Sequence, residues 1–520
     1  MTKLQTFDST LRDGAQGANI SFSVDDKIRI IKVLDDLGID FIEAGNPFSN
    51  PAEMRFFRKI SSLRLTHSRI VAFGSTRRKD TAPAEDANLR SLREAGTEYV
   101  AIFGKSHIRH VTDVLKASPE ENLGMISDSV RYLTTNGKKV VFDAEHFFDG
   151  YRTDPEYAMA ALRAAKEGGA VCLCLCDTNG GMFPDEIQDI VSAVSAAFPG
   201  ADIGIHCHND GGLAVANSIA AVKAGARHLQ GTFLGFGERC GNTNLCTLIC
   251  NLQLKRGYEC IPEKNLPHIY ESALTIAETA NVAIEQNAPY VGMNAFAHKA
   301  GMHADGVLKY SSSFEHVDPE RIGNQRKFLL SEISGKSTIY EKLKDIFPDL
   351  DRNSRELADI AAALKERALQ GYSYEAAEAS FILLVEKVLG RYHSSFDLIN
   401  YKIINELPAI EGKVASAIIK IRVNGQTRIE ASDGEGPVHA MDLALRAALS
   451  DFYPSIAKVS LTDFKVRVLD PQKATAAKVR VLITSTDGQD SWTTVGVSDD
   501  MIEASWIALT DSIDYALMRH

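Results

Sequence analysis

The sequence lacks the features of a membrane or secreted protein. It contains no run of about 18 apolar residues, so a membrane-spanning helix is not expected. The opening segment MTKLQTFDSTLRDG has no apolar stretch of the kind found in a secretory signal. Eight cysteines in 520 residues are too few for a disulfide framework. Together these absences predict a cytoplasmic protein.

Positive charge is also scarce. The chain has 57 Lys and Arg against 68 Asp and Glu, which gives a net charge of -11. Nucleic acids and anionic membranes bind to clustered basic side chains, so neither partner is expected. A small anionic molecule can still bind where an arginine, a metal ion or a helix N-terminus supplies local positive charge.

Short apolar segments alternate with longer amphipathic ones over the first 260 residues. Apolar residues at helical spacing predict helices over residues 25–37, 186–197 and 212–224. Eight apolar segments predict strands over residues 4–10, 41–44, 70–74, 99–103, 140–144, 170–176, 203–208 and 228–234. The alternation implies a parallel sheet, and the number of strands suits a (β/α)8 TIM barrel over residues 1–260. An open, doubly wound sheet is the alternative.

The pattern changes after Gly257. Residues 261–410 are expected to form largely helical accessory subdomains, with a connector over residues 391–412. Residues 411–520 are expected to form an α+β domain with the order strands, helix, strands, helix, which suggests two related halves. Alternating apolar residues predict half-buried strands at 419–423, 464–468 and 479–483. This region has no obvious catalytic cluster, so a regulatory or oligomerising role is favoured.

The sharpest chemical signal is His206-Cys207-His208, at the end of the seventh predicted strand. Residues i and i+2 of a strand point to the same face, so the two imidazoles project together. Two neutral imidazoles side by side suit a divalent metal ion. The alternative is a structural role, in which the two histidines are hydrogen bonded within the core. The barrel interpretation favours the metal, because catalytic groups gather at the carboxyl ends of barrel strands.

Polar residues also follow four other predicted strands. They are Asp8, Arg12 and Asp13 after the first, Glu145 and His146 after the fifth, Asp177 and Thr178 after the sixth, and Glu238, Arg239 and Asn242 after the eighth. Each group alone could be a set of satisfied loop side chains. Their convergence at one end is what a barrel active site predicts. A carboxylate such as Asp13 could complete a metal site, and Arg12 could clamp a substrate carboxylate.

Three cysteines, Cys172, Cys174 and Cys176, alternate along the sixth predicted strand. Same-face neighbours on one strand diverge, which disfavours disulfides between them. A metal site built on this C-x-C-x-C run is one interpretation. Reduced, buried thiols in a cytoplasmic core are the commoner one.

Several segments resemble a known superfamily. DSTLRDG, HCHND and GFGERCGN are similar to segments of the DRE-TIM metallolyases. Within that superfamily, nearly the whole chain resembles the α-isopropylmalate synthase and citramalate synthase family, and the long-form citramalate synthases most of all. GEGPVHAMDLALRAAL resembles the allosteric C-terminal domain of that family. Two segments depart from the citramalate synthase pattern, namely Asn46-Pro47-Phe48-Ser49 and the isopropylmalate synthase-like GMHADGVLK.

The resemblance implies a ligand set and a substrate site. The metal ligands would be Asp13, His206, His208 and the side-chain oxygen of Asn242. A set of two oxygens and two nitrogens tolerates Mg²⁺, Mn²⁺ or Zn²⁺. Arg12 would face the keto oxygen of a 2-oxo acid and Thr178 would bind its carboxylate. Glu145, Phe103 and Asp143 would line the pocket.

The same resemblance implies a catalytic base outside the barrel. His303 resembles the base of the family, Asp305 could orient it, and Tyr310 resembles the neighbour that assists it. His298 is a weaker candidate for the base. Since the base lies beyond the barrel, it is expected to reach the barrel mouth of a partner subunit in a homodimer.

The implied activity is a Claisen condensation of acetyl-CoA with a 2-oxo acid. Pyruvate is favoured, giving (R)-citramalate for isoleucine biosynthesis. The alternatives are a 2-isopropylmalate synthase using 2-oxoisovalerate for leucine biosynthesis, a lyase or carboxyltransferase on the same barrel, and a non-catalytic sensor. An amino acid is expected to act on the C-terminal domain, isoleucine in the first case and leucine in the second.

Overall fold

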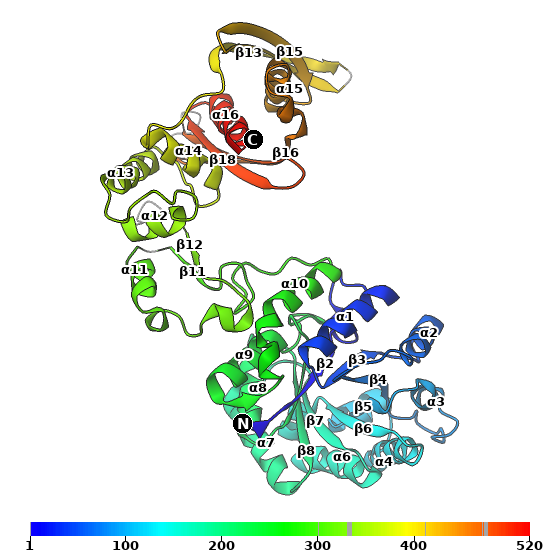
Figure 1. Ribbon diagram of the computed structural model, residues 1–520. Helices are drawn as coiled ribbons and strands as arrows, with labels where there is room; N and C mark the ends of the chain where they lie inside the picture. Colours follow the sequence, from blue (N-terminus) through cyan, green and yellow to red (C-terminus); the bar gives the residue numbers. More distant parts are fainter. Residues whose placement is uncertain are drawn as a thin grey trace. The chain divides into compact units, whose positions relative to one another are not determined.

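The computed structural model describes residues 2–299, 301–329, 335–410, 412–470, 472 and 477–519 (Figure 1). The chain divides into two compact units. The first is Met1–Phe296 with Val317–Arg326, and the second is Ala297–His316 with Lys327–His520. No helix in the described part of the chain combines the length and apolar content needed to cross a membrane.

The first unit is a closed barrel of eight parallel strands. Their order is β2 (Gln5–Asp8), β3 (Phe41–Gly45), β4 (Arg69–Ser75), β5 (Tyr99–Lys105), β6 (Lys139–Glu145), β7 (Cys172–Asp177), β8 (Asp202–Cys207) and β9 (His228–Gly231). β2 pairs with both β3 and β9, so the sheet closes on itself. The predicted TIM barrel is confirmed and the doubly wound sheet is excluded.

Helices form the layer outside the barrel (Figure 1). They are α1 (Val24–Leu37), α2 (Pro51–Ile60), α3 (Ala87–Glu94), α4 (Pro119–Thr135), α5 (Phe147–Thr153), α6 (Pro155–Gly168), α7 (Pro184–Ala197), α8 (Ala214–Lys223) and α9 (Leu245–Arg256). The two ends of the barrel segment also meet: β1 (Thr2–Lys3) at its start pairs with β10 (Tyr258–Glu259) at its end. The next helix, α10 (Ile269–Thr279), packs on α1.

Helix α1 illustrates how local sequence builds this layer. The Ser23 side chain accepts a hydrogen bond from the Asp26 backbone N–H, and the Asp26 carboxylate accepts one from the Ser23 N–H. This capping box satisfies N–H groups that have no partner within the helix. Gly38 ends the helix at φ 92°, a left-handed conformation that glycine adopts without strain. Ile30 and Leu34 are fully buried in the apolar core of the barrel unit.

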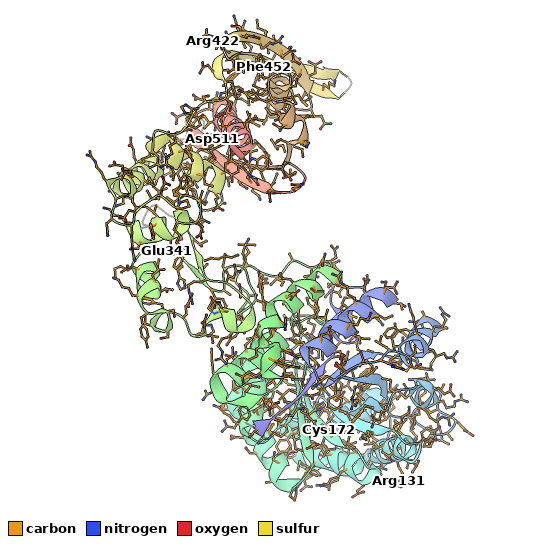
Figure 2. The ribbon with its side chains drawn as sticks, in the orientation of Figure 1. Arg131, Cys172, Glu341, Arg422, Phe452 and Asp511 are labelled. Atoms are coloured by element: carbon orange, nitrogen blue, oxygen red, sulfur yellow. The ribbon has the colours of Figure 1, made fainter. Side chains whose placement is uncertain are left out.

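Strand β7 is buried along its whole length, as expected for a parallel strand covered on both faces. Its three cysteines belong to a small apolar cluster with one residue from each of five other strands, Phe7, Phe41, Val71, Ala101 and Val141. This cluster closes the barrel interior below the carboxyl ends of the strands. All eight cysteines of the chain are free thiols, and Cys172 is labelled within the barrel in Figure 2.

The second unit begins with short elements and continues with helices. β11 (Ala297–His298) pairs with β12 (Lys327–Phe328), and α11 (Gly301–Lys309) lies between them in sequence. The helices α12 (Lys336–Leu343), α13 (Arg355–Leu369) and α14 (Glu378–Val388) follow, within the region 261–410 that was expected to be largely helical.

Two similar halves complete the second unit. The first has β13 (Asp397–Ile410), β14 (Lys413–Val423) and β15 (Gln426–Gly434), followed by α15 (Pro437–Ser450). The second has β16 (Ser460–Val468), β17 (Val479–Thr486) and β18 (Ser491–Ser498), followed by α16 (Met501–Arg519). Each half is a three-stranded antiparallel sheet with one helix, so the expected order of elements is confirmed.

Two expectations for this region are wrong. Residues 391–412 are not a connector, because β13 occupies most of the segment and pairs with β14. The alternating residues Phe464, Val466 and Val468 do not form a half-buried face, since they are 37%, 43% and 49% exposed. Alternation reports which residues share a face of a strand, whereas burial of that face depends on what packs against it.

Candidate active site

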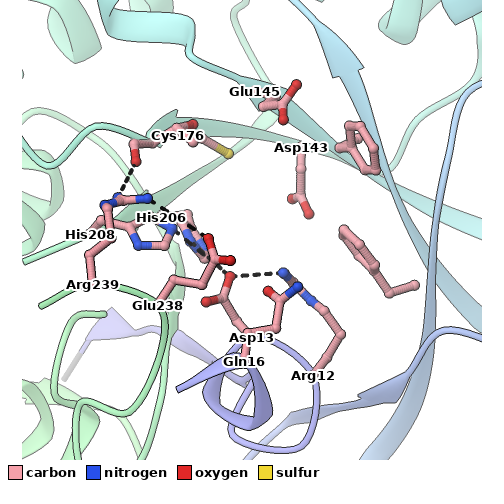
Figure 3. Close-up of a pocket in the computed structure, with 13 residues that line it drawn as sticks. Arg12, Asp13, Gln16, Asp143, Glu145, Cys176, His206, His208, Glu238 and Arg239 are labelled. Carbon is pink, nitrogen blue, oxygen red and sulfur yellow. Dashed lines mark hydrogen bonds and ion pairs between the residues drawn. The ribbon is translucent and has the colours of Figure 1, made fainter. Parts of the chain in front are cut away.

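A cavity of about 250 Å³ lies at the carboxyl ends of the barrel strands (Figure 3). Its lining comes from the ends of several strands and the loops after them: Arg12, Asp13, Gln16, Phe73, Phe103, Asp143, Glu145, Cys176, Thr178, His206, His208, Glu238 and Arg239. Active sites of TIM barrels occupy this end. Most of the barrel residues singled out from the sequence therefore meet at one cavity.

Asp13, His206 and His208 form the most compact group of metal-binding side chains in this cavity. Nε2 of His206 lies 3.8 Å from Oδ2 of Asp13, and Nε2 of His208 lies 3.9 Å from the same oxygen. One ligand atom from each residue lies within 4.8 Å of the other two. All three residues are buried. The spacing suits a single divalent cation bound by one carboxylate and two imidazoles.

The ionisation of the three side chains suits metal binding. Burial and the neighbouring His208 lower the pKa of His206 to about 4, so the ring is neutral near pH 7. Burial also lowers the pKa of His208. Burial alone would raise the pKa of Asp13, but Arg12 and the two imidazoles hold it well below its usual range. Neutral imidazoles beside an ionised carboxylate are the protonation states that a metal ligand set requires.

Asn242 lies beside this group rather than in the cavity lining. Its backbone forms an isolated β-bridge with His208, and its Nδ2 donates to Oδ1 of Asp13 at 2.7 Å and to the carbonyl of Phe236 at 3.0 Å. Its Oδ1 is buried and has no hydrogen-bond partner among the described residues. A buried acceptor without a partner carries a desolvation cost, which a metal ion would relieve. The donor set therefore fits a divalent cation.

Gly237 permits this close packing. At φ 148° it adopts a conformation that side chains rarely tolerate, and a Cβ there would lie 2.3 Å from Nδ2 of Asn242. A larger residue would push Asn242 away from Asp13.

Arg12 links the metal-binding group to a second buried carboxylate. Its Nη1 donates to Oδ2 of Asp13 at 2.8 Å, and its Nε donates to Oε2 of Glu43 at 2.6 Å. The guanidinium stacks over the ring of Phe73, with Cζ 3.8 Å from the ring centroid. These three contacts hold the positive charge at the cavity wall, where a substrate oxygen can reach it.

Glu43 is a residue that the sequence analysis missed. It is fully buried in β3, it accepts hydrogen bonds from Ser9 and Arg12, and its Oε1 has no partner in the described part of the chain. Burial raises its pKa despite the contact with Arg12. An acidic residue inside the apolar segment FIEAG was the available signal, because a buried carboxylate is rare without a specific partner.

Asp143 is a second buried carboxyl group in the cavity. Burial raises its pKa to about 7, and the negative charge of Glu43 contributes to the rise. Its Oδ1 accepts a hydrogen bond of 2.9 Å from Nε2 of Gln230, and Oε1 of Gln230 lies 3.0 Å from Nδ1 of His206. Gln230 was also missed from the sequence, since no motif marks it.

The remaining barrel candidates have clear partners. Glu145 pairs with Lys105, and Thr178 Oγ1 accepts a hydrogen bond of 2.9 Å from the His146 backbone N–H. Phe103 stacks on Phe73 with the ring centroids 5.6 Å apart. Phe48, in the segment that departs from the family pattern, is 42% exposed and lies outside the set of described residues that line the cavity.

The candidates outside the barrel belong to the second unit. His303 packs its ring against Phe314, with the centroids 5.2 Å apart, and Tyr310 is exposed. Asp305 accepts hydrogen bonds from Lys309 at 2.6 Å and from Ser337 at 3.3 Å. His298 forms an ion-pair contact of 2.9 Å with Glu315. The carboxylate of Asp305 is thus engaged by partners other than His303.

Three family profiles match the chain. The HMGL-like profile matches residues 3–276, just over half of the chain. The profile of the homocitrate synthase post-HMGL domain-like region matches residues 290–371, and that of the LeuA allosteric (dimerisation) domain matches residues 375–517. The LeuA match begins at residue 375, just before helix α14 and well before the boundary at residue 411 expected from the sequence.

Relatives match along the full length. The chain is 48% identical to the (R)-citramalate synthase of Aquifex aeolicus, over 99% of this chain and 98% of that protein. It is 46% identical to the (R)-citramalate synthase of Synechocystis, over 99% and 96% of the two chains. The chain is an HMGL-like enzyme of the citramalate synthase family. The resemblance inferred from its motifs is confirmed.

The sequence identity to a related type of enzyme is lower. The 2-isopropylmalate synthase of Methanocaldococcus jannaschii is 30% identical over 99% of this HMGL-like enzyme and 95% of that protein. Enzymes of the family use a divalent metal, and the Asp13, His206 and His208 group in this enzyme has the composition to hold one.

Proposed function

We propose that this enzyme condenses acetyl-CoA with pyruvate and water to give (R)-citramalate, free CoA and a proton, as a step in isoleucine biosynthesis. The observation that carries the proposal is the full-length identity of 48% to a curated (R)-citramalate synthase, against 30% to a 2-isopropylmalate synthase. The proposed site supplies the groups that such a condensation needs.

The 2-oxo acid would bind between Arg12 and Thr178. The Arg12 guanidinium, held by Glu43 and Asp13, is positioned to stabilise the negative charge that develops on the keto oxygen. The Thr178 hydroxyl already accepts from the His146 N–H, which leaves its own proton to donate to the substrate carboxylate.

A divalent cation held by Asp13, His206, His208 and Asn242 would supply Lewis-acid polarisation of the substrate. Mg²⁺, Mn²⁺ and Zn²⁺ are all compatible with two oxygen and two nitrogen donors. The chain's own contribution is to hold Asp13 ionised and both imidazoles neutral in a buried site.

The proton chemistry would come from the second unit. We assign His303 as the base that removes a proton from the acetyl-CoA methyl group, and Tyr310 and Asp305 as residues that assist it. The resulting enolate carbon would attack the keto carbon of pyruvate, and the alkoxide would take up a proton. Water would then cleave the thioester and release CoA, which makes the reaction effectively irreversible. General-base catalysis by an imidazole contributes roughly 10²–10⁴ in rate.

The wall of the cavity favours a small 2-oxo acid. Phe73 and Phe103 stack along one side, Asp143 lies in the buried lining, and Glu145 stands with Lys105 near the rim. Two aromatic rings and a buried carboxyl group leave little apolar space for the branched side chain of 2-oxoisovalerate.

A panel of 2-oxo acids tests the proposal. The full-length enzyme with Mg²⁺ or Mn²⁺ is mixed with acetyl-CoA and pyruvate, 2-oxobutanoate or 2-oxoisovalerate, and the free thiol of CoA is measured. The expected result is the highest kcat/KM with pyruvate. A preference for 2-oxoisovalerate would replace the assignment by 2-isopropylmalate synthase, and no thiol release with any of the acids would overturn condensation altogether.

We also propose a homodimer in which His303 serves the barrel of the partner subunit, with isoleucine as an inhibitor acting on the LeuA domain. The support is the match to the LeuA allosteric (dimerisation) profile over residues 375–517. Mixing equal amounts of the impaired Arg12→Lys and His303→Ala chains should restore part of the activity if the site is shared. An active monomer in sedimentation experiments would contradict the dimer, and unaltered rates with added isoleucine would contradict the effector.

A further inference from the structure

A second group of potential metal ligands lies below the proposed active site. Asp143 on β6 is in register with Cys174 on β7, and Cys176 follows two residues later on the same face. All three side chains are buried. The group shares no residue with Asp13, His206 and His208, and the proposed condensation makes no use of either thiol.

The geometry of this group is compact. One carboxylate oxygen of Asp143 and the sulfur atoms of Cys174 and Cys176 all lie within 4.8 Å of one another. Asp143 and Cys174 are direct partners in the register of β6 and β7, which sets their side chains next to each other. Small movements of the side chains would bring the three atoms to the ligand spacing of a tetrahedral site.

The group can also be reached from solvent. Asp143 and Cys176 both line the cavity of about 250 Å³ at the barrel mouth, and Figure 3 shows the Cys176 sulfur and the Asp143 carboxylate facing it. An ion could therefore enter through the cavity, and a water molecule there could complete its coordination. Cys174 lies one step deeper than Cys176 and is not part of the cavity lining, and Cys172 lies one step deeper again.

We infer that Asp143, Cys174 and Cys176 form a second cation site, selective for soft, thiophilic divalent ions such as Cd²⁺ and Zn²⁺. Two sulfur donors and one oxygen donor suit these ions, whereas Mg²⁺ requires oxygen ligands. On binding, the two thiol protons leave to solvent as two metal–sulfur bonds form. Asp143 is neutralised by the ion rather than by a proton.

The charges around the group are mixed. Glu43 adds negative charge near Asp143, and Arg12 adds positive charge near Asp143 and Cys176. With Asp143 and both thiolates bound, the site places three negative charges around a divalent ion. Arg12, which is also paired with Asp13 and Glu43, offsets part of this excess. The two sites of the barrel would differ in their selectivity, because the Asp13 group accepts Mg²⁺, Mn²⁺ or Zn²⁺ whereas the thiolate site would not hold Mg²⁺.

Occupation of this site should inhibit the enzyme. An ion bound to Asp143 and Cys176 would lie in the wall of the cavity proposed for the 2-oxo acid. This consequence rests on the proposed function, whereas binding itself does not. Excess Mg²⁺ should not reverse the inhibition, because Mg²⁺ does not compete for thiolate ligands.

Cadmium titration of the full-length, reduced protein in saturating Mg²⁺ tests the site. Thiolate ligation gives a sulfur-to-cadmium absorption band in the ultraviolet, which ligands of the Asp13 group cannot produce. The expected result is a band whose final amplitude corresponds to one thiolate-bound Cd²⁺ per chain, since Cd²⁺ held by the Asp13 group adds nothing to this band. The Cys174→Ser and Cys176→Ser double variant should lose the band and bind Cd²⁺ at least about 100-fold more weakly, since loss of an outer-shell partner alone costs 10–100-fold.

Two matched variants serve as controls. Cys172→Ser removes a buried thiol from the same face of β7, and Cys240→Ser removes an exposed thiol of the barrel unit. Both should keep the band. Loss of the band in Cys240→Ser, or its persistence in the double variant, would overturn the assignment.

A measurement on the unmodified protein avoids dependence on variant folding. X-ray absorption at the cadmium edge counts sulfur atoms around the ion directly. Two sulfur ligands support the site, and a shell of only nitrogen and oxygen overturns it. Because absorption and ligand counts do not require turnover, this result is separate from the outcome of the 2-oxo acid panel.

Discussion

Oε1 of Gln230 lies 3.0 Å from Nδ1 of His206. The amide of the same Gln230 donates to Asp143 at 2.9 Å, so its orientation is set and its oxygen faces the imidazole. His206 must then carry its proton on Nδ1 and present an unprotonated Nε2 toward Asp13. An amide fixed by a carboxyl group thus selects the tautomer that binds a metal.

Replacing Gln230 by Leu should weaken metal binding by about 10–100-fold, because His206 loses the partner that orients its ring. Calorimetric titration of the metal-free protein with Mn²⁺ measures the effect without turnover. Gln5→Leu is a matched control, since Gln5 lies 3.3 Å from the ring of a different buried histidine, His228. Equal affinities in the wild type and Gln230→Leu would remove Gln230 from the metal site.

Arg12→Lys should reduce kcat/KM by about 10²–10³, the usual effect of losing one charge-stabilising donor. A lysine cannot bond to Asp13 and Glu43 while stacking over Phe73. Steady-state kinetics with pyruvate and acetyl-CoA give the measurement. Arg77→Lys, at an arginine paired with Asp128, should leave the rate unaltered. A wild-type rate in Arg12→Lys would show that this charge is not used.

Phe103→Ala should shift preference toward larger 2-oxo acids. The ring of Phe103 is part of the cavity wall and stacks on Phe73, so its removal opens apolar space. The ratio of kcat/KM for 2-oxobutanoate to that for pyruvate should rise about 10-fold or more, within the range that one methylene contributes. Phe48→Ala is the control, because Phe48 is exposed and should not affect the ratio. A constant ratio in both variants would place the selecting wall elsewhere.

Because His228 is buried, we expect the free energy of unfolding to decrease at acidic pH. Burial lowers the pKa of His228 to about 4, and Nε2 finds no hydrogen-bond partner in the described part of the chain. Between pH 6.5 and 4 the unfolded chain binds a proton at this position and the folded chain does not, so stability falls as the pH falls. The contribution is about 2 kcal/mol between pH 7 and pH 5.

His228→Gln should therefore show a smaller decrease in thermal midpoint between pH 7 and pH 5 than the wild type. Differential scanning calorimetry at the two pH values measures the difference. His268→Gln, at an exposed histidine of the same unit, should retain the wild-type pH dependence. If His228→Gln and wild type lose stability in parallel, the buried imidazole is not the cause.

Local sequence patterns were sufficient to predict the strands of the barrel. Each of the eight strands was marked by a short apolar segment, and each predicted segment overlaps a strand of the structure. Parallel strands bring their carboxyl ends to one edge, so polar residues after those segments could be predicted to meet. His206 and His208 needed only the two-residue repeat of a strand.

Packing decided what those patterns could not. Glu43 and Gln230 lie within strands and belong to no motif, and their roles depend on which side chains face them across the barrel. The strand β13 was hidden in an expected connector, because pairing with β14 rather than a strong local pattern defines it. Phe464 shows the same limit: its strand was predicted correctly from the alternation, but the predicted burial of its side chain was wrong.

By itself the sequence determined the eight strands of the barrel unit and the family, because periodicity and motifs are properties of neighbouring residues. Only the tertiary structure decided which groups touch: Arg12 between Asp13 and Glu43, Gln230 between His206 and Asp143, and the two thiols beside Asp143. Distances between strands and the degree of burial arise when the sheet closes. They set the charges and pKa values on which the chemistry depends.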